Sequence, residues 1–221
     1  SAADIGFALA PRINAAGRLE DMGLGIECLL TDDRSRAREL AEILHGINAE
    51  RRGVQEQMTA EAEAAVARAV VDGGNVPIAV CLHDAGWHPG VVGLVASKIK
   101  DRLHRPTIAF APSEPGSPSL RGSARSIRGF HIRDALAAID AAPPGLIGKF
   151  GGHAMAAGLT IAADALPRFQ AAFEAVGQEW LDEKTLSRVI ETDGDIGDDC
   201  FVPPFVAMLG AQVWGQGFPP P

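Results

Sequence analysis

The stretch PIAVCL at residues 77–82 is a short apolar run, and an amphipathic segment follows it at residues 91–103. The run has the length and apolar character of a buried strand. The second segment repeats its apolar residues at helical spacing, at Val91, Val92, Leu94, Val95, Ile99 and Leu103. A strand that leads into a helix is a unit of an α/β layer, so these residues predict an α/β fold.

Strand and helix signals continue to alternate after this unit. We expect strands at residues 106–111, 120–126 and 159–161, and helices at residues 132–141 and 166–181. A loop rich in Pro, Gly and Ser separates the first two strands, and Pro143-Pro144 closes the first helix. The alternation predicts a mixed, partly parallel sheet that is flanked by helices.

A long helix is predicted before the α/β layer, from about Asp33 to Val71. Its apolar residues recur every three or four positions, at Leu40, Ile43, Leu44, Ile47, Val54, Met58, Ala62, Val66 and Val70. Residues 31–33 offer N-cap candidates, and Gly73-Gly74 supplies a stop. At 1.5 Å per residue the helix would span roughly 57 Å. We interpret it as a connector between two lobes; a core helix with frayed ends is the alternative.

The two ends of the chain differ from this centre. Residues 6–18 (GFALAPRINAAGR) place two arginines around a small-residue turn, which predicts a buried loop. From Lys184 onward the sequence suggests a strand at residues 186–191, an acidic turn and a short helix near residues 205–209. This tail is too short to fold alone. The chain starts without Met and stops at a Pro-Pro-Pro run, so we expect a segment of a longer protein.

Composition and charge restrict the class of protein. The 221 residues are 47% hydrophobic, and the net charge of −8 argues at first against nucleic-acid binding. However, residues 98–133 contain eight bases and two acids, whereas residues 160–200 contain ten acids and three bases. A local basic surface can therefore recruit phosphates, although solvated charged faces are the plainer interpretation.

Cysteine usage and hydropathy point to a reducing compartment. Cys28, Cys81 and Cys200 are few, odd in number and widely separated, so they fit neither a disulfide framework nor a zinc site. Apolar segments are short or carry charges, and no basic and hydrophobic targeting segment stands at the start. We expect a cytoplasmic protein without a membrane span.

Two short motifs suggest an anion site. The first is GGHAMAAG at residues 151–158, where two glycines let the backbone approach a phosphate and His153 is available as a donor or charge partner. A tight turn with a capping histidine is its plainer interpretation. The second is GSARS at residues 122–126, where Ser123 and Arg125 emerge on one face of an extended chain. Arginine and serine together suit a terminal phosphate, and an exposed edge strand is the alternative.

Five motifs in order carry a resemblance to a known family. They are PRINAAGR at residues 11–18, WHPGVVG at 87–93, GSARS at 122–126, KFGGHAMAAG at 149–158 and WGQ at 214–216. Over nearly the whole chain they resemble the RecJ family of bacterial single-stranded-DNA-specific 5′ to 3′ exonucleases, within the DHH phosphoesterase superfamily. The GGH block alone would indicate only the superfamily, whereas INAAGR and WGQ point to these exonucleases.

The resemblance implies an organisation and a set of site residues. Residues 1–32 would be a remnant of the interdomain region after the DHH domain, 33–72 the connecting helix, 73–183 the DHH-associated substrate-binding domain, and 184–221 the start of an OB-fold domain. By the same resemblance, Gly151, Gly152 and His153 would contact backbone phosphate near the catalytic metals, with His153 as the catalytic residue. The expected substrate-binding residues also include Ser123, Arg125, Ser126, Arg12, Arg18 and Asn14, with the 5′-phosphate held by Ser123 and Arg125.

The departure from the family pattern concerns the metals. The family's manganese or magnesium ligands lie in motifs of an N-terminal DHH domain that include an Asp-His-His triplet, and this sequence contains no such triplet. We therefore expect a chain that holds single-stranded DNA but binds no metal and is inactive alone. Two alternatives stay open. One is a superfamily enzyme that acts on short oligonucleotides or cyclic dinucleotides, and the other is a non-catalytic nucleic-acid or protein interaction module.

Overall fold

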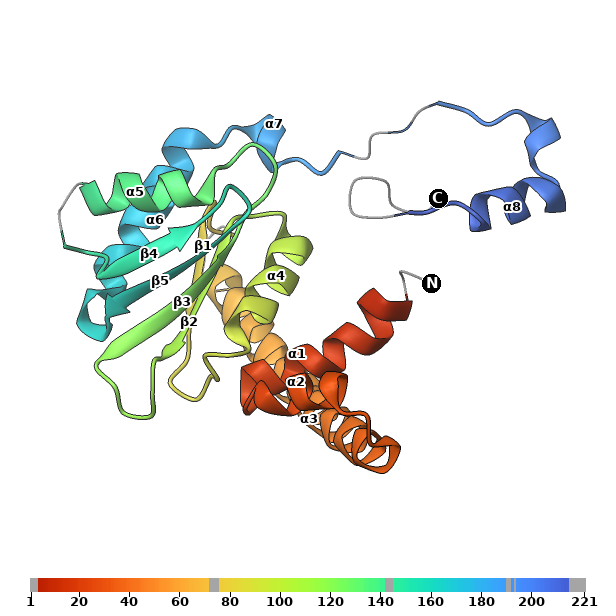
Figure 1. Cartoon of the computed structure of the whole chain (residues 1–221). Helices are drawn as coiled ribbons and strands as arrows, with labels where there is room; N and C mark the ends of the chain where they lie inside the picture. Colours follow the sequence, from red (N-terminus) through yellow and green to blue (C-terminus); the bar gives the residue numbers. More distant parts are fainter. Residues whose placement is uncertain (1–3, 72–75, 142–144, 190–191, 193, 215–221) are drawn as a thin grey trace. The chain divides into compact units, whose positions relative to one another are not determined.

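A computed structural model describes residues 4–71, 76–141, 145–189, 192 and 194–214 (Figure 1). The chain divides into two units, Ser1–Arg188 and Val189–Pro221. The first unit contains the sheet and the long helix, and the second contains short helical segments. In the described residues, no helix is both long and apolar enough to cross a membrane.

A five-stranded mixed sheet forms the centre of the first unit. Its strands are β1 (Val80–His83), β2 (Thr107–Pro112), β3 (Ser119–Arg125), β4 (Lys149–Gly152) and β5 (Ala156–Ala162). The spatial order is β1-β2-β3-β5-β4, in which β1 and β2 are parallel and the other pairs are antiparallel. The α/β fold class and the partly parallel sheet predicted from the sequence are therefore confirmed, although β4 was not foreseen as a strand.

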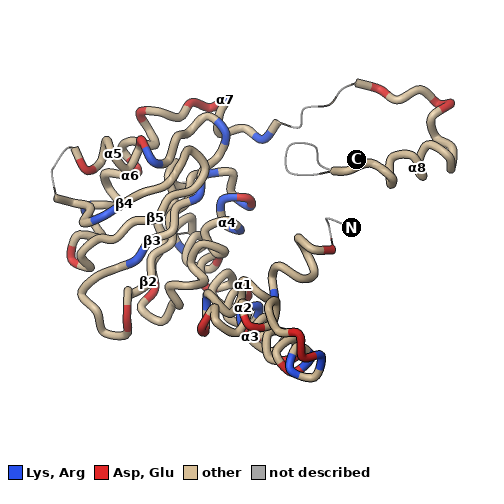
Figure 2. Tube along the Cα trace, viewed as in Figure 1, with Lys and Arg blue, Asp and Glu red and all other residues tan. Residues whose placement is uncertain are grey.

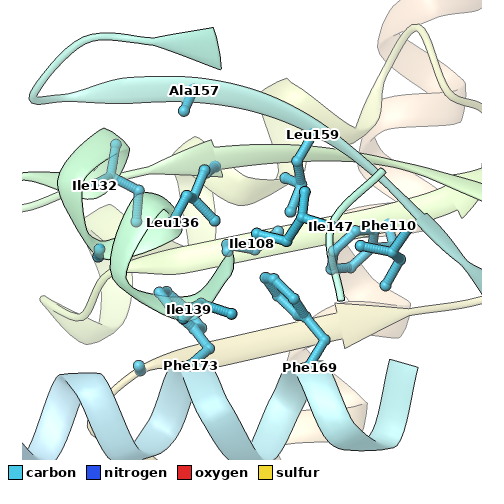
Figure 3. Packing of buried hydrophobic residues seen from close by; sticks show 14 of the residues in the cluster. Ile108, Phe110, Ile132, Leu136, Ile139, Ile147, Ala157, Leu159, Phe169 and Phe173 are labelled. Carbon is cyan, nitrogen blue, oxygen red and sulfur yellow. The ribbon is translucent and has the colours of Figure 1, made fainter. Parts of the chain in front are cut away.

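Helices cover both faces of the sheet. One face packs against α5 (Ile132–Ala141) and α6 (Leu166–Trp180), whose apolar side chains meet those of β2, β3 and β5 (Figure 3). Phe110 and Phe169 pack edge to face there, with ring centroids 5.4 Å apart. The other face packs against α4 (Val92–Leu103) and the second half of the long helix, with Trp87 between them. Burying each such large apolar side chain contributes about 1.5–3 kcal/mol.

The long helix α3 runs over Arg34–Val71, as the periodicity predicts. Asp33 caps its start, because the Asp33 carboxylate accepts the amides of Ser35 and Arg36 at 2.8 and 3.3 Å. Leu40 and Leu44 are buried in its first half, where α3 contacts the helices at the start of the chain, and Met58 and Ala62 are buried against α4 in its second half. The same helix therefore packs against the helices at the start of the chain with its first half and against α4 with its second half. The predicted stops at Gly73-Gly74 and Pro143-Pro144 lie outside the described residues.

The predicted buried loop at residues 6–18 is wrong. The structure has a π-helix at Asp4–Leu9 (η1), α1 at Ala10–Leu19 and α2 at Gly23–Leu30. The small residues Ala15 and Ala16 are fully buried, because they let α1 approach α3 closely. The buried positions of α1 are therefore occupied by small residues. Helical periodicity is recognised from large apolar residues, so this helix could not be recognised from its sequence.

The predicted strand at residues 186–191 is also wrong where the structure describes it. Leu186 ends a short helix, α7 (Glu183–Leu186), which Asp182 caps by accepting the Thr185 amide. The remaining short elements are η2 (Ala163–Ala165), η3 (Asp198–Cys200) and α8 (Pro203–Gly210), the last of which matches the helix expected near residues 205–209. The described part of residues 184–221 contains no strand, so the start of an OB-fold stays a prediction. Gly215 and Gln216 of the WGQ motif lie outside the described residues.

Candidate phosphate-binding site

The Gly151-Gly152 pair closes strand β4, and the turn lies at residues 153–155. The expected glycine turn is therefore displaced by two residues. The His153 amide donates to the Ala156 carbonyl at 2.8 Å, which ties the hairpin. Because neighbouring residues of a strand point their N–H groups to opposite sides, the Gly152 amide faces the free edge of the sheet. Exposed His153 follows directly, so an open donor and an imidazole lie side by side.

Gly152 is required for this hairpin. Its φ of 150° is in a region that favours glycine, and a Cβ there would lie 2.4 Å from the Ala156 carbonyl oxygen. Gly151 is different, because a Cβ on it would meet nothing within 4 Å. The first glycine leaves open space on the surface, and the second permits the fold of the hairpin.

Ser123 and Arg125 share one face of β3, as the two-residue spacing predicts. Both lie close to Gly93 in the first turn of α4, where a Cβ would come within 3.3 Å of Ser123 Oγ and 3.0 Å of an Arg125 guanidinium nitrogen. The Gly93 amide has no hydrogen-bond acceptor among the residues that the structure describes. Amides at the start of a helix attract anions. A hydroxyl, a guanidinium and a free helix amide therefore converge on one point.

Arg18 joins this point from the end of α1. Its guanidinium donates to the Gly90 carbonyl at 3.1 Å, directly before α4. Asn14 is exposed one helical turn earlier, on the same face of α1 as Arg18. Arg12 lies elsewhere, because it donates to His45 Nδ1 of α3 at 3.2 Å and to the Ala8 carbonyl. Of the two arginines in the motif, only Arg18 is brought to Ser123 and Arg125.

The arginines at the site repel one another. Burial lowers the pKa of the Arg125 guanidinium, and the nearby charge of Arg18 lowers the pKa further. Arg51 on α3 has its pKa lowered by burial and then by Arg18 and Arg52. In the described part of the chain none of these arginines has a carboxylate in ion-pair contact, whereas Arg36 pairs with Glu27 at 2.7 Å. A concentration of unneutralised cations favours an anionic ligand.

Ser126 has a structural contact rather than an open one. It is 1% exposed, and its hydroxyl donates to the Phe130 carbonyl at 2.5 Å. Its amide donates to the Met155 carbonyl at 3.0 Å, which links the end of β3 to the hairpin turn. These bonds hold the end of β3 against the hairpin turn. The contact of Ser126 with substrate stays a prediction, and the buried hydroxyl does not face the surface in this structure.

Sequence reasoning missed three contributors: Gly90, Gly93 and Arg51. A Cβ on Gly90 would lie 2.1 Å from the Arg18 carbonyl oxygen, so this glycine allows α1 to contact the start of α4. Arg51 is held by Asn48 and Gln55 of its own helix, at 2.7–3.3 Å. The signal for Gly90 and Gly93 was present, since glycines stand at the start of a predicted helix. Arg51 had no signal, because Arg18, the site residue whose charge acts on it, comes from a remote part of the chain.

The described residues do not provide a divalent-metal site. No group of three or more His, Cys, Asp or Glu side chains that could hold a metal ion occurs among them. The donors at the site are instead amides, a hydroxyl and guanidinium groups, which bind anions. The site as folded fits phosphate, and it does not fit a cation.

The comparisons with known proteins show which proteins this chain resembles. Residues 73–179, which include all five strands of the sheet, match the DHHA1 domain family. The chain is 45% identical over 221 residues to the "Single-stranded-DNA-specific exonuclease RecJ" of Dickeya dadantii (strain 3937). It is 43% identical over 222 residues to the protein of that name from Escherichia coli (strain K12). Each match covers 100% of this chain and 38% of the relative.

Solved structures show the same relationship. RecJ from Thermus thermophilus in complex with Mg²⁺ has a TM-score of 0.70 and 32% identity, over 82% of this chain and 27% of that chain. An exonuclease RecJ bound to manganese has a TM-score of 0.64 and 34% identity, over 82% of this chain and 43% of that one. The resemblance inferred from the motifs is confirmed, because the chain is similar over its whole length to proteins of the RecJ family. It spans about two fifths of the length of the curated relatives.

Proposed function

We propose that this chain is the substrate-holding part of a metal-dependent single-stranded-DNA 5′ to 3′ exonuclease that acts in DNA repair and recombination. The observation that carries the proposal is the convergence of Ser123, Arg125 and the Gly93 amide beside Arg18, without a carboxylate partner among the described residues. The similarity of the whole of this chain to part of proteins named for single-stranded-DNA exonuclease activity supports it. Such a DNA enzyme would work in the cytoplasm.

The terminal-phosphate pocket consists of Ser123, Arg125 and the Gly93 amide. Arg125 offers a planar fork of donors that matches two phosphate oxygens, and Ser123 Oγ offers a third donor. The Gly93 amide adds a donor with the positive end of the α4 dipole behind it. A 5′-phosphate with two negative charges would gain more from this pocket than an internal phosphate with one. The pocket would thereby select the 5′ end of the strand.

The hairpin would hold the next phosphate toward the catalytic centre. Arg125 pairs with Ala156 across β3 and β5, and the His153 amide donates to the same Ala156, so the two side chains start on either side of β5. The Gly152 amide and the His153 imidazole can donate to a backbone phosphate there. Manganese or magnesium, expected in a DHH domain of the longer protein, would supply the activated water and charge stabilisation. The residues of this chain bind and orient the phosphates.

Two other functions are less well supported. An enzyme of the same superfamily that acts on short oligonucleotides or cyclic dinucleotides would share the GGH hairpin. However, the whole of this chain, and not the hairpin alone, is similar to proteins named RecJ. A non-catalytic binding module would need only the phosphate contacts. An activity assay of the longer protein distinguishes this alternative, because a protein that contains only a non-catalytic binding module would show no metal-dependent hydrolysis.

The proposal is tested by comparing 5′-phosphorylated and 5′-hydroxyl oligothymidylate, with binding to the 221-residue chain measured by fluorescence anisotropy. We expect tighter binding of the phosphorylated strand and loss of this preference in Arg125→Gln. Arg125→Lys should restore it only in part, because lysine lacks the fork. Arg38→Gln, an exposed change on α3, is the matched control and should leave the preference intact. Equal affinities of the wild-type chain for the two strands would refute the pocket.

A further inference from the structure

A second row of polar side chains crosses the same face of the sheet beyond the terminal-phosphate pocket. Arg121 of β3 pairs with Thr160 of β5, and Thr160 pairs with Lys149 of β4. Residues paired across antiparallel strands point to the same face, so these three, the Arg121 row, stand side by side. At about 4.8 Å between strands, the Arg121 and Lys149 backbones lie roughly 10 Å apart, with the Thr160 hydroxyl between them.

The part of this face that bears the row is not covered by α4, as the exposure of its residues shows. Leu120, Gly122 and Ala124 alternate with the row residues on β3 and face the core under α5 and α6. Arg121 and Lys149 are exposed and Thr160 is half-buried. In the described residues, no carboxylate is in ion-pair contact with Arg121 or Lys149. Figure 2 shows basic segments near the labels of β3 and β4, with β5 between these two strands. Two unneutralised cations therefore flank one hydroxyl.

A strip without side chains connects the row to the pocket. Ser123 pairs with Gly158, and Gly158 pairs with Gly151, directly beside the Arg121 row. A Cβ on Gly151 would meet nothing within 4 Å, and one on Gly158 would meet only the Gly122 carbonyl oxygen at 4.0 Å. This glycine strip, formed by Gly151 and Gly158, is therefore solvent-accessible surface and not part of the packed core. Two residues of strand separate its centre from the row, about 7 Å at 3.3 Å per residue.

We propose that the Arg121 row is a second phosphate subsite, which binds another phosphate of the strand whose 5′-phosphate occupies the pocket. The inference rests on the proposed function. Arg121 and Lys149 contact the phosphate from two sides, and Thr160 Oγ donates between them. The sugar lies over the glycine strip, where a side chain would block it. The Arg121 row contacts only the phosphate and not the bases, so it binds strands of every base sequence with the same affinity.

The test compares a ligand that has one phosphate with a ligand that has many. Arg121→Gln/Lys149→Gln is measured with deoxythymidine 5′-monophosphate and with 5′-phosphorylated oligothymidylate, by calorimetry and anisotropy over a range of salt concentrations. We expect unchanged affinity for the mononucleotide and about tenfold weaker binding of the oligonucleotide. The slope of log affinity against log salt should fall by about 0.7 for each phosphate that the variant no longer neutralises. Thr160→Val should weaken oligonucleotide binding in the same way but to a smaller extent.

Controls separate this inference from the proposed function. Arg133→Gln removes an exposed charge on α5, across the sheet, and should leave oligonucleotide binding unchanged. Circular dichroism confirms that the double variant is folded. Equal weakening of mononucleotide and oligonucleotide, or no weakening of either, overturns the subsite while the Arg125-dependent end preference stands. Absence of that end preference in the wild-type chain overturns the proposed function instead.

Discussion

Arg18 and Gly90, 72 positions apart in the sequence, are in direct contact. The Arg18 guanidinium donates to the Gly90 carbonyl at 3.1 Å, and a Cβ on Gly90 would lie 2.1 Å from the Arg18 carbonyl oxygen. This contact fixes the end of α1 against the start of α4. It places the cation of one motif beside the helix amide of another, so the phosphate site depends on a glycine that would not itself touch the ligand.

Gly90→Ala should separate the two helices. The added methyl group collides with backbone, which cannot move aside as a flexible side chain can, so we expect a loss of about 1–3 kcal/mol in the free energy of unfolding. Binding of 5′-phosphorylated single-stranded DNA should weaken as Arg18 moves away. Urea denaturation and anisotropy measure the two effects. Gly46→Ala is the control, because Gly46 lies in α3 with nothing within 4 Å of its Cβ position. Alanine there should stabilise the helix by about 0.5–1 kcal/mol; if both variants behave alike, the contact has no special role.

Two glycines on neighbouring strands should respond in opposite ways. A Cβ on Gly122 would lie 2.4 Å from the Phe110 ring, so Gly122→Ala should overpack the core and destabilise the fold by about 1–3 kcal/mol. Gly158→Ala faces open space, so it should leave the denaturation midpoint nearly unchanged and weaken oligonucleotide binding instead. A stable Gly122→Ala variant, or a Gly158→Ala variant with wild-type affinity, would contradict the assignment of the two faces.

Cys81 should react slowly with alkylating reagents at neutral pH. Burial raises the pKa of the Cys81 thiol to about 12, with a hydrogen bond from Gln170 acting weakly in the opposite direction. In a Cys28→Ser/Cys200→Ser background, the iodoacetamide rate should still rise with pH above about pH 9, where an unperturbed thiol has levelled off. Because the folded-state pKa is raised, the unfolded chain loses this proton first. The free energy of unfolding should therefore fall as pH rises between about 9 and 12. A rate plateau near pH 9 would contradict the burial.

The chain alone should not hydrolyse DNA. Its described residues provide phosphate donors but no cluster of metal ligands. With Mn²⁺ or Mg²⁺ and labelled single-stranded DNA, we expect binding without release of nucleotides, and hydrolysis when the longer protein that contains a DHH domain is used. Clear metal-dependent hydrolysis by the 221-residue chain would place a catalytic centre within it and refute the division of labour.

The sequence predicted most of the domain and only part of the site. The long helix was readable because its apolar residues follow one period over many positions, and β2 was readable because it is a short continuous apolar run. α1 and β4 were missed because Ala, Asn and Gly carry weak preferences, and packing against remote segments decides their structure. Ser123 and Arg125 could be paired from strand geometry alone. Their meeting with Gly93 and Arg18 depends on tertiary contacts that no local pattern encodes.

The central claim is that phosphate binds at the start of α4, beside β3 and the hairpin. A ¹⁵N NMR titration of the chain with 5′-phosphorylated oligothymidylate tests it most directly, because the Gly93, Gly151 and Gly152 amides report on the site individually. We expect these three resonances to shift, and the amide of Gly177, on α6 across the sheet, to stay in place. Shifts confined to Gly177 and the α5–α6 face, with Gly93 unmoved, would contradict the account.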